Sequence, residues 1–265
     1  MTRDILRQVV VVIAVMATLV MNGLANALPL NGVTTGEVSA GFQVYFVPAG
    51  YVFSIWGLIY VGLVLYTIYQ ALPARRDNPR LRATGYLFAL SCLANITWLF
   101  LWHYEYFVLT LVAMAALLLL LIAIYLRLGI GRTAVSTAER WLVQLPFSIY
   151  LGWISVATIA NVTSVLYYLN WGGWGLSPEI WTVIMLLVGV GLVLAMTLTR
   201  GDVAYGLVII WAFAGIAVKH GGTPFVASAA WIAVGLVVLA LMIGLFFNRR
   251  ARQHSAIELQ STSQI

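Results

Sequence analysis

Aromatic and amide side chains recur at helical spacing in three apolar segments of the chain. Phe53, Trp56 and Tyr60 are separated by three and four residues, which places them along one face of a helix. Asn95 and Trp98 are three residues apart in a second apolar segment. Aromatic rings stack on flat molecules, and an amide in an apolar environment needs a hydrogen-bond partner. These residue types favour a site that binds a small molecule.

A third apolar segment carries a longer set of the same kind. Tyr150, Trp153, Ala157 and Asn161 follow one another at spacings of three, four and four residues on one helical face. We therefore expect the three faces to form one cavity, with an indole from each segment in its wall and the asparagines hydrogen-bonded inside it. The alternative is that these aromatic faces only pack the bundle.

No constellation for an enzyme or a metal site accompanies these faces. Cys92 is the single cysteine, and His103, His220 and His254 are scattered without metal-ligand spacing. Asp202 and the glutamates lie near the ends of apolar segments, whereas ion-coupled carriers usually place carboxylates at mid-depth. Binding without turnover is favoured, and a transporter is the alternative.

The composition requires that the apolar segments lie in a membrane. Of the 265 residues, 63% are hydrophobic and 8% are charged, and the mean hydropathy is +0.99. A soluble domain carries about 25% charged residues. This chain has too little polar surface for a soluble enzyme, a nucleic-acid-binding protein or a disordered protein.

Apolar runs long enough to cross a bilayer divide the chain into spans. A crossing helix needs roughly 20 apolar residues. The runs lie at about 8–28, 51–72, 83–102, 107–127, 142–169, 179–199, 204–219 and 225–247. The expected fold class is therefore all-α, a polytopic membrane helix bundle of about eight transmembrane helices, in which the seventh span is the shortest.

Basic residues sort to one side of this topology. If the eight spans alternate across the membrane, all the arginines fall on one side, and Lys219 alone falls on the other. The side rich in arginine is cytoplasmic by the positive-inside rule. We therefore expect a multi-pass protein of the plasma (inner) membrane with both termini in the cytoplasm.

The first span and the loop after it each allow two interpretations. Arg3 and Arg7 before a short apolar run resemble a cleavable signal peptide, but Asn22 within the run favours a retained helix that packs against others. The loop from Pro29 to Gly50, which has no obvious element of its own, is either a lid over a binding site or a flexible connector.

The ends of the spans carry three further features. Lys219 and His220 either bind an anionic group or cap the seventh span. The segment 249–265 is a polar tail that we expect to be disordered. Aromatic residues at span ends are expected in the membrane interface: Trp102, Tyr104, Tyr106, Phe107, Trp171 and Trp174.

The three aromatic segments resemble the tryptophan-rich sensory protein family (TspO/MBR, the translocator or peripheral benzodiazepine receptor family). The family's second helix opens with a proline-rich turn, Trp-Val-Phe, Trp and Leu-x-x-Tyr. Its third carries Asn-x-x-Trp, and its fifth carries Trp, then Ala four residues later and Asn eight later. The comparable residues here are Pro48, Tyr51, Val52, Phe53, Trp56 and Tyr60, then Asn95 and Trp98, then Trp153, Ala157 and Asn161.

The resemblance covers residues 8–170, which is the usual five-helix fold of the family. Three further spans follow, so we expect a long form of that fold. Its parts are a five-helix domain (1–170), three additional helices (171–248) and a polar cytoplasmic tail (249–265).

The resemblance implies a pocket between the first five helices, closed by the first loop. The ligand-binding residues implied are Tyr51, Phe53, Trp56, Tyr60, Asn95, Trp98, Tyr150, Trp153, Ala157 and Asn161. Family members bind porphyrins and, in some cases, sterols or benzodiazepine-like ligands. The expected ligand is a porphyrin, protoporphyrin or haem-like, or another hydrophobic small molecule, and no cofactor is required.

The remaining expectations concern partners and activity. The expected partners are the lipid bilayer and the hydrophobic ligand, with a homodimer as a further option and no nucleic acid. Receptor-like binding is the leading function. The alternatives are small-molecule transport and an enzyme-like, light-dependent degradation of bound porphyrin.

Overall fold

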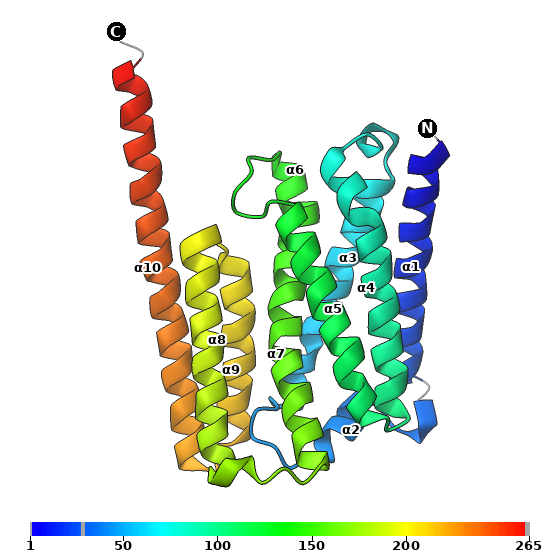
Figure 1. The fold of residues 1–265 in the computed structure, drawn as a ribbon, viewed down its shortest axis with the longest axis vertical. Helices are drawn as coiled ribbons and strands as arrows, with labels where there is room; N and C mark the ends of the chain where they lie inside the picture. The colour runs from blue at the N-terminus through cyan, green and yellow to red at the C-terminus, as the bar shows by residue number, and fades with distance from the viewer. Residues whose placement is uncertain (1, 28–29, 263–265) are drawn as a thin grey trace.

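The protein is a bundle of long helices, and the described residues contain no strand (Figure 1). The computed structural model describes residues 2–27 and 30–262. Its long helices are α1 (Thr2–Ala27), α3 (Ile55–Ala71), α4 (Pro79–His103), α5 (Phe107–Arg127), α7 (Leu145–Tyr168), α8 (Pro178–Arg200), α9 (Val203–Lys219) and α10 (Pro224–Thr262). The expected all-α membrane bundle is confirmed.

Seven of the described helices are long and apolar enough to cross a membrane. The exception is α9, an apolar helix of 17 residues, which is at the lower end of the length that spans a bilayer, about 17–25 residues. It coincides with the shortest of the predicted spans and packs against α7, α8 and α10. The chain is an integral multi-pass membrane protein.

The long helices form two groups that lie side by side (Figure 1). In the first group, α4 packs against α1 and α5, while α7 packs against α3 and α5. The second group consists of α8, α9 and α10, which pack against one another. The contact between α7 and α9 joins the groups. The ends of the chain lie at one end of the bundle, and the short helix α2 (Thr35–Ala40) lies at the other.

Hydrogen bonds join the two groups at both ends of the bundle. At the end that holds the chain ends, the Tyr125 hydroxyl donates to Asp202 Oδ2 over 2.8 Å. At the end near α2, the backbone N–H of Ala49 donates to the carbonyl oxygen of Gly215 over 3.2 Å. A Cβ atom on Gly215 would overlap Val52 Cγ2, so only glycine permits this approach of α9 to the turn before α3.

Two segments differ from their sequence-based predictions. The loop before the second span contains a 3-10 turn (Leu30–Gly32) and the helix α2, although no element was expected there. Thr34 and Glu37 form a capping box that starts α2: the Thr34 side chain accepts from the Glu37 N–H, and the Glu37 side chain accepts from the Thr34 N–H. The second is the C-terminal segment that was expected to be a disordered tail: α10 runs through it as far as Thr262.

Candidate ligand-binding site

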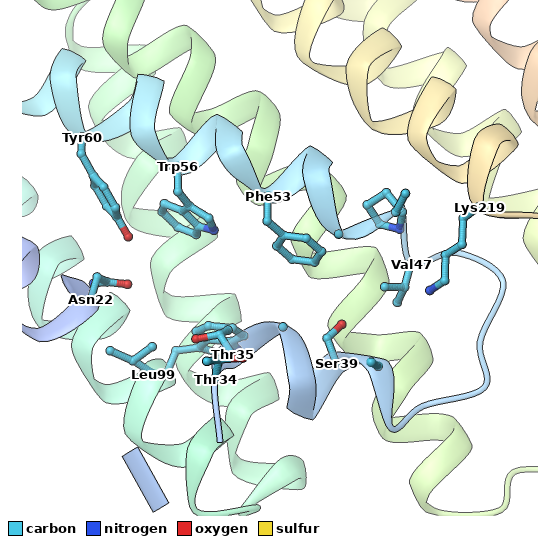
Figure 2. A pocket seen from close by; sticks show the side chains of 16 residues that line it. Asn22, Thr34, Thr35, Ser39, Val47, Phe53, Trp56, Tyr60, Leu99 and Lys219 are labelled. Carbon is cyan, nitrogen blue, oxygen red and sulfur yellow. The ribbon is translucent and has the colours of Figure 1, made fainter. Parts of the chain in front are cut away.

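A cavity of about 620 Å³ opens at the end of the bundle where α2 lies (Figure 2). Phe53, Trp56 and Tyr60 project into it from the 3-10 turn η2 (Gly50–Ser54) and the first turns of α3. Residues of α2 face them across the cavity. The other lining residues that matter below are Asn22, Val47, Pro48, Trp98, Leu99 and Lys219.

A smaller pocket of about 60 Å³ extends this cavity toward α5 and α7. The two spaces share Phe53, Trp56 and Trp98 in their walls. Trp153 of α7 lines the smaller pocket as well, so an indole from each of the three predicted segments lies in one wall. We call this smaller space the deep pocket.

The aromatic rings of the wall contact one another, one pair stacked and two pairs edge-on. Trp56 stacks on Tyr60 with ring centroids 5.5 Å apart, and Trp153 meets Trp56 edge-on at 6.3 Å. Phe53 also lies edge-on to Trp153, at 5.8 Å. Such pairs stabilise by about 0.5–1.5 kcal/mol beyond the burial of their area, which holds the wall in shape.

The predicted asparagines are hydrogen-bonded inside the bundle. Asn22 Nδ2 donates to Asn95 Oδ1 over 2.8 Å. Trp98 Nε1 donates to Asn161 Oδ1 over 3.2 Å, and Asn161 Nδ2 donates to Thr110 Oγ1 over 2.8 Å. Because these amides are buried, the bonds fix how α1, α4, α5 and α7 are rotated toward one another.

One polar atom of a residue that lines the deep pocket lacks such a partner. Trp153 is 3% exposed, and its indole nitrogen forms no hydrogen bond with any described residue. Buried donors are nearly always paired, so an unpaired one in the wall of a pocket calls for an acceptor. A ligand that carries an acceptor would satisfy it.

The helix α2 covers the cavity and is held by the end of α4. His103 Nδ1 donates to the carbonyl oxygen of Leu30 over 3.2 Å, because a carbonyl can only accept. With the proton on Nδ1, His103 Nε2 accepts from the Thr35 hydroxyl over 2.9 Å. Trp102 Nε1 donates to the Thr35 carbonyl oxygen over 3.3 Å. These bonds position the loop as a cover over the site.

Most of the predicted binding residues line one of the two spaces, and two do not. Tyr51 is exposed and lies edge-on to Trp211 of α9, with ring centroids 5.5 Å apart. Tyr150 is buried behind the wall, where its ring contacts Trp56 at 6.0 Å. The lining residues are Phe53, Trp56, Tyr60, Asn95, Trp98, Trp153, Ala157 and Asn161. Their part in binding stays a prediction.

One aromatic residue of the site was not predicted from the sequence. Trp102 was expected in the membrane interface, but it is 4% exposed, lines the deep pocket and stacks on Trp98 at 5.4 Å. Phe107, expected in the interface too, is buried against Trp102 at 5.4 Å. The spacing of Trp98 and Trp102, four residues, was the available signal.

A family model described as TSPO-like protein matches residues 8–243. The match contains all three aromatic segments and continues past residue 170 through α8, α9 and most of the apolar part of α10. A search of the curated proteins found no match, and neither did a search of the solved structures.

Proposed function

The chain belongs to the TSPO-like protein family, and from this premise we propose that it is a receptor-like membrane protein that binds a porphyrin-like or other flat hydrophobic ligand. The ligand enters the cavity beneath α2 and reaches the deep pocket. Its rings lie against Trp56 and Trp98, which line both spaces, and only one edge of the ligand reaches Trp153 in the small deep pocket. Offset and edge-on ring contacts favour a flat aromatic molecule over a flexible chain of equal size.

The observation that carries this proposal is the unpaired indole nitrogen of Trp153 in an aromatic wall. Packing alone explains aromatic rings in a helix bundle. Other buried groups of the described residues, such as the Tyr69 hydroxyl, also lack a partner, but among them only the Trp153 indole belongs to a residue of the pocket wall. An unpaired buried donor costs about 1–3 kcal/mol. A ligand acceptor, such as a ring nitrogen or a carbonyl oxygen, removes this cost on binding.

Binding is favoured over transport because aromatic residues fill the bundle beyond the cavity. Tyr66, Phe88 and Phe147 are buried and meet edge-on, with ring centroids 5.0–5.3 Å apart. They come from α3, α4 and α7, the same helices that build the wall of the cavity. A transported molecule would have to displace all three rings, whereas a bound ligand can stay in the cavity without displacing them.

The proposed orientation in the membrane is based on the distribution of the arginines. We place both termini in the cytoplasm, and the cavity then opens on the outer side of the plasma (inner) membrane. The five-helix domain with three added helices is a long form of the family's fold in this proposal. A homodimer and light-dependent porphyrin breakdown stay predictions.

The proposal is tested with the full chain reconstituted in lipid nanodiscs. Protoporphyrin is added, and the quenching of tryptophan fluorescence is followed to equilibrium. Saturable quenching with one ligand per chain is expected. Quenching that rises linearly with ligand, as in empty nanodiscs, would reject a site. If vesicles that contain the protein take up protoporphyrin faster than empty vesicles do, the protein is a transporter and not a receptor.

A further inference from the structure

The wall of the cavity carries one charge. Among the described residues that line the cavity and the deep pocket, Lys219 is the only charged side chain. It is the last residue of α9 and therefore comes from the second helix group. Figure 2 shows its amino group extending from α9 toward Val47 at the side of the cavity.

No described carboxylate neutralises this lysine. None of the ion pairs among the described residues includes Lys219. At this end of the bundle, the Glu37 side chain accepts hydrogen bonds from Thr34, and Glu179 accepts one from the Tyr45 hydroxyl over 3.0 Å. The exposed Lys219 side chain thus lines the cavity together with the aromatic residues and has no anionic partner among the described residues.

The neighbouring histidine adds no second charge at neutral pH. The His220 ring packs edge-on against Tyr45 at 5.2 Å and is partly buried. Burial, and after it the charge of Lys219, lower the pKa of His220 below its ordinary value of 6.5. His220 is therefore neutral at pH 7, and Lys219 is the cation of the cavity.

The backbone holds Lys219 at a fixed position relative to the aromatic wall. Gly215 lies four residues before it, on the same face of α9. That face touches the turn that carries Phe53, through the hydrogen bond from Ala49 to Gly215 and the close contact with Val52. The lysine is therefore placed on the cavity by packing of the backbone.

We infer that Lys219 is an anion-binding residue of the cavity, and that the ligand is a flat hydrophobic acid. Its rings lie against the aromatic wall, and its carboxylate pairs with the Lys219 ammonium group at the side. This inference rests on the proposed function and narrows the class of ligand. It also gives the three C-terminal helices a role, because they supply the charge that the first five helices lack at this site.

The test compares one ring system with and without its charge. Protoporphyrin and its dimethyl ester are titrated into the full chain in nanodiscs of zwitterionic lipid, so that lipid headgroups contribute no net charge. The variants are Lys219→Met and Lys219→Arg. Arg132→Met, which removes an exposed cation from the loop at the opposite end, is the matched control.

Lys219→Met should weaken binding of the acid about fivefold and leave binding of the ester unchanged. Lys219→Arg and Arg132→Met should bind both ligands like the wild type.

Each other outcome has a distinct meaning. If Lys219→Met weakens acid and ester equally, the lysine acts on the fold and the inference is overturned. If the wild type binds both ligands and Lys219→Met changes neither affinity, the cavity recognises the rings but not the carboxylate. Only this inference is then overturned. If the wild type binds neither ligand, the proposed function itself fails.

Discussion

Trp153 and Trp174 share a side chain but not an environment. Trp153 is 3% exposed in the wall of the deep pocket, whereas Trp174 is 82% exposed beyond the end of α7. Replacing Trp153 with leucine should weaken protoporphyrin binding about fivefold, because one aromatic contact of about 1 kcal/mol is lost. Trp174→Leu should leave binding unchanged. Absorbance titrations of both variants measure this. An equal loss of affinity in the two variants would mean that the ligand binds among exposed aromatic residues.

Asn161 supports two partners, and its removal should cost stability. Its side chain accepts from Trp98 and donates to Thr110. Asn161→Leu should lower the free energy of unfolding by about 1–3 kcal/mol, since both partners are left unpaired in an apolar interior. The control is Val162→Ala, a change on the exposed side of the same helix. Unfolding in mixed micelles gives both values, and a loss no larger than that of the control would refute this role.

Individual residues were predictable where the helix is regular. Spacings of three and four residues placed the indoles of Trp56, Trp98 and Trp153 in one wall because each set lies on helical turns. Tyr51 was included through the family resemblance and not through its spacing, and its ring packs outside the cavity against Trp211. Trp102 was misplaced because the helix that covers it, α2, was not foreseen.

At the scale of elements, α2 should loosen in acid. Hydrogen bonds from Thr34 hold the pKa of Glu37 below its ordinary value of 4.5. A carboxylate with a lowered pKa stabilises the folded state above its unfolded pKa, and this stabilisation is lost as the pH falls through the folded value. Hydrogen exchange of the α2 amides should therefore accelerate, relative to α5, below about pH 4.5. In Glu37→Gln this acid-dependent step should disappear. An unchanged step in that variant would assign the acid sensitivity to another group.

The contact between α9 and the turn before α3 depends on a glycine. A Cβ atom at Gly215 overlaps Val52, whereas a Cβ atom at Gly235 in α10 meets nothing within 4 Å. Gly215→Ala should lower the free energy of unfolding by about 1–3 kcal/mol through overpacking. Gly235→Ala should be neutral or stabilising, because alanine is the better helix former. Thermal unfolding of the two variants decides between these effects, and equal melting temperatures would contradict the close contact.

The spans were predictable from the sequence and the short elements were not. A run of about 20 apolar residues has few alternatives to a membrane helix, so α3, α4, α5 and α8 are where the sequence places them. The six residues of α2 are too few to show a period. Its capping box, Thr34 and Glu37, was the readable sign of a helix start, but only the contacts with His103 and Trp102 fix where that helix lies.

For the whole molecule, the arrangement of the arginines predicts the orientation in the membrane. The only native cysteine, Cys92, is buried and provides a silent background. In intact cells, Ser255→Cys should resist a membrane-impermeant thiol reagent, because the C-terminal segment is expected in the cytoplasm. Trp174→Cys, at the opposite end of the bundle, should react. Labelling of Ser255→Cys without labelling of Trp174→Cys would mean that the orientation in the membrane is the reverse of the predicted one.

The central claim is that one flat ligand occupies the cavity formed under α2, and blocking the deep pocket tests it most directly. Ala157 lines this pocket, and Val162 lies on the exposed side of the same helix. The measurement is the Soret shift of protoporphyrin titrated into the wild type, Ala157→Phe and Val162→Phe in nanodiscs. The account predicts a saturable shift with one ligand per chain for the wild type and Val162→Phe, and its loss in a folded Ala157→Phe. The same saturable shift in all three proteins would contradict it.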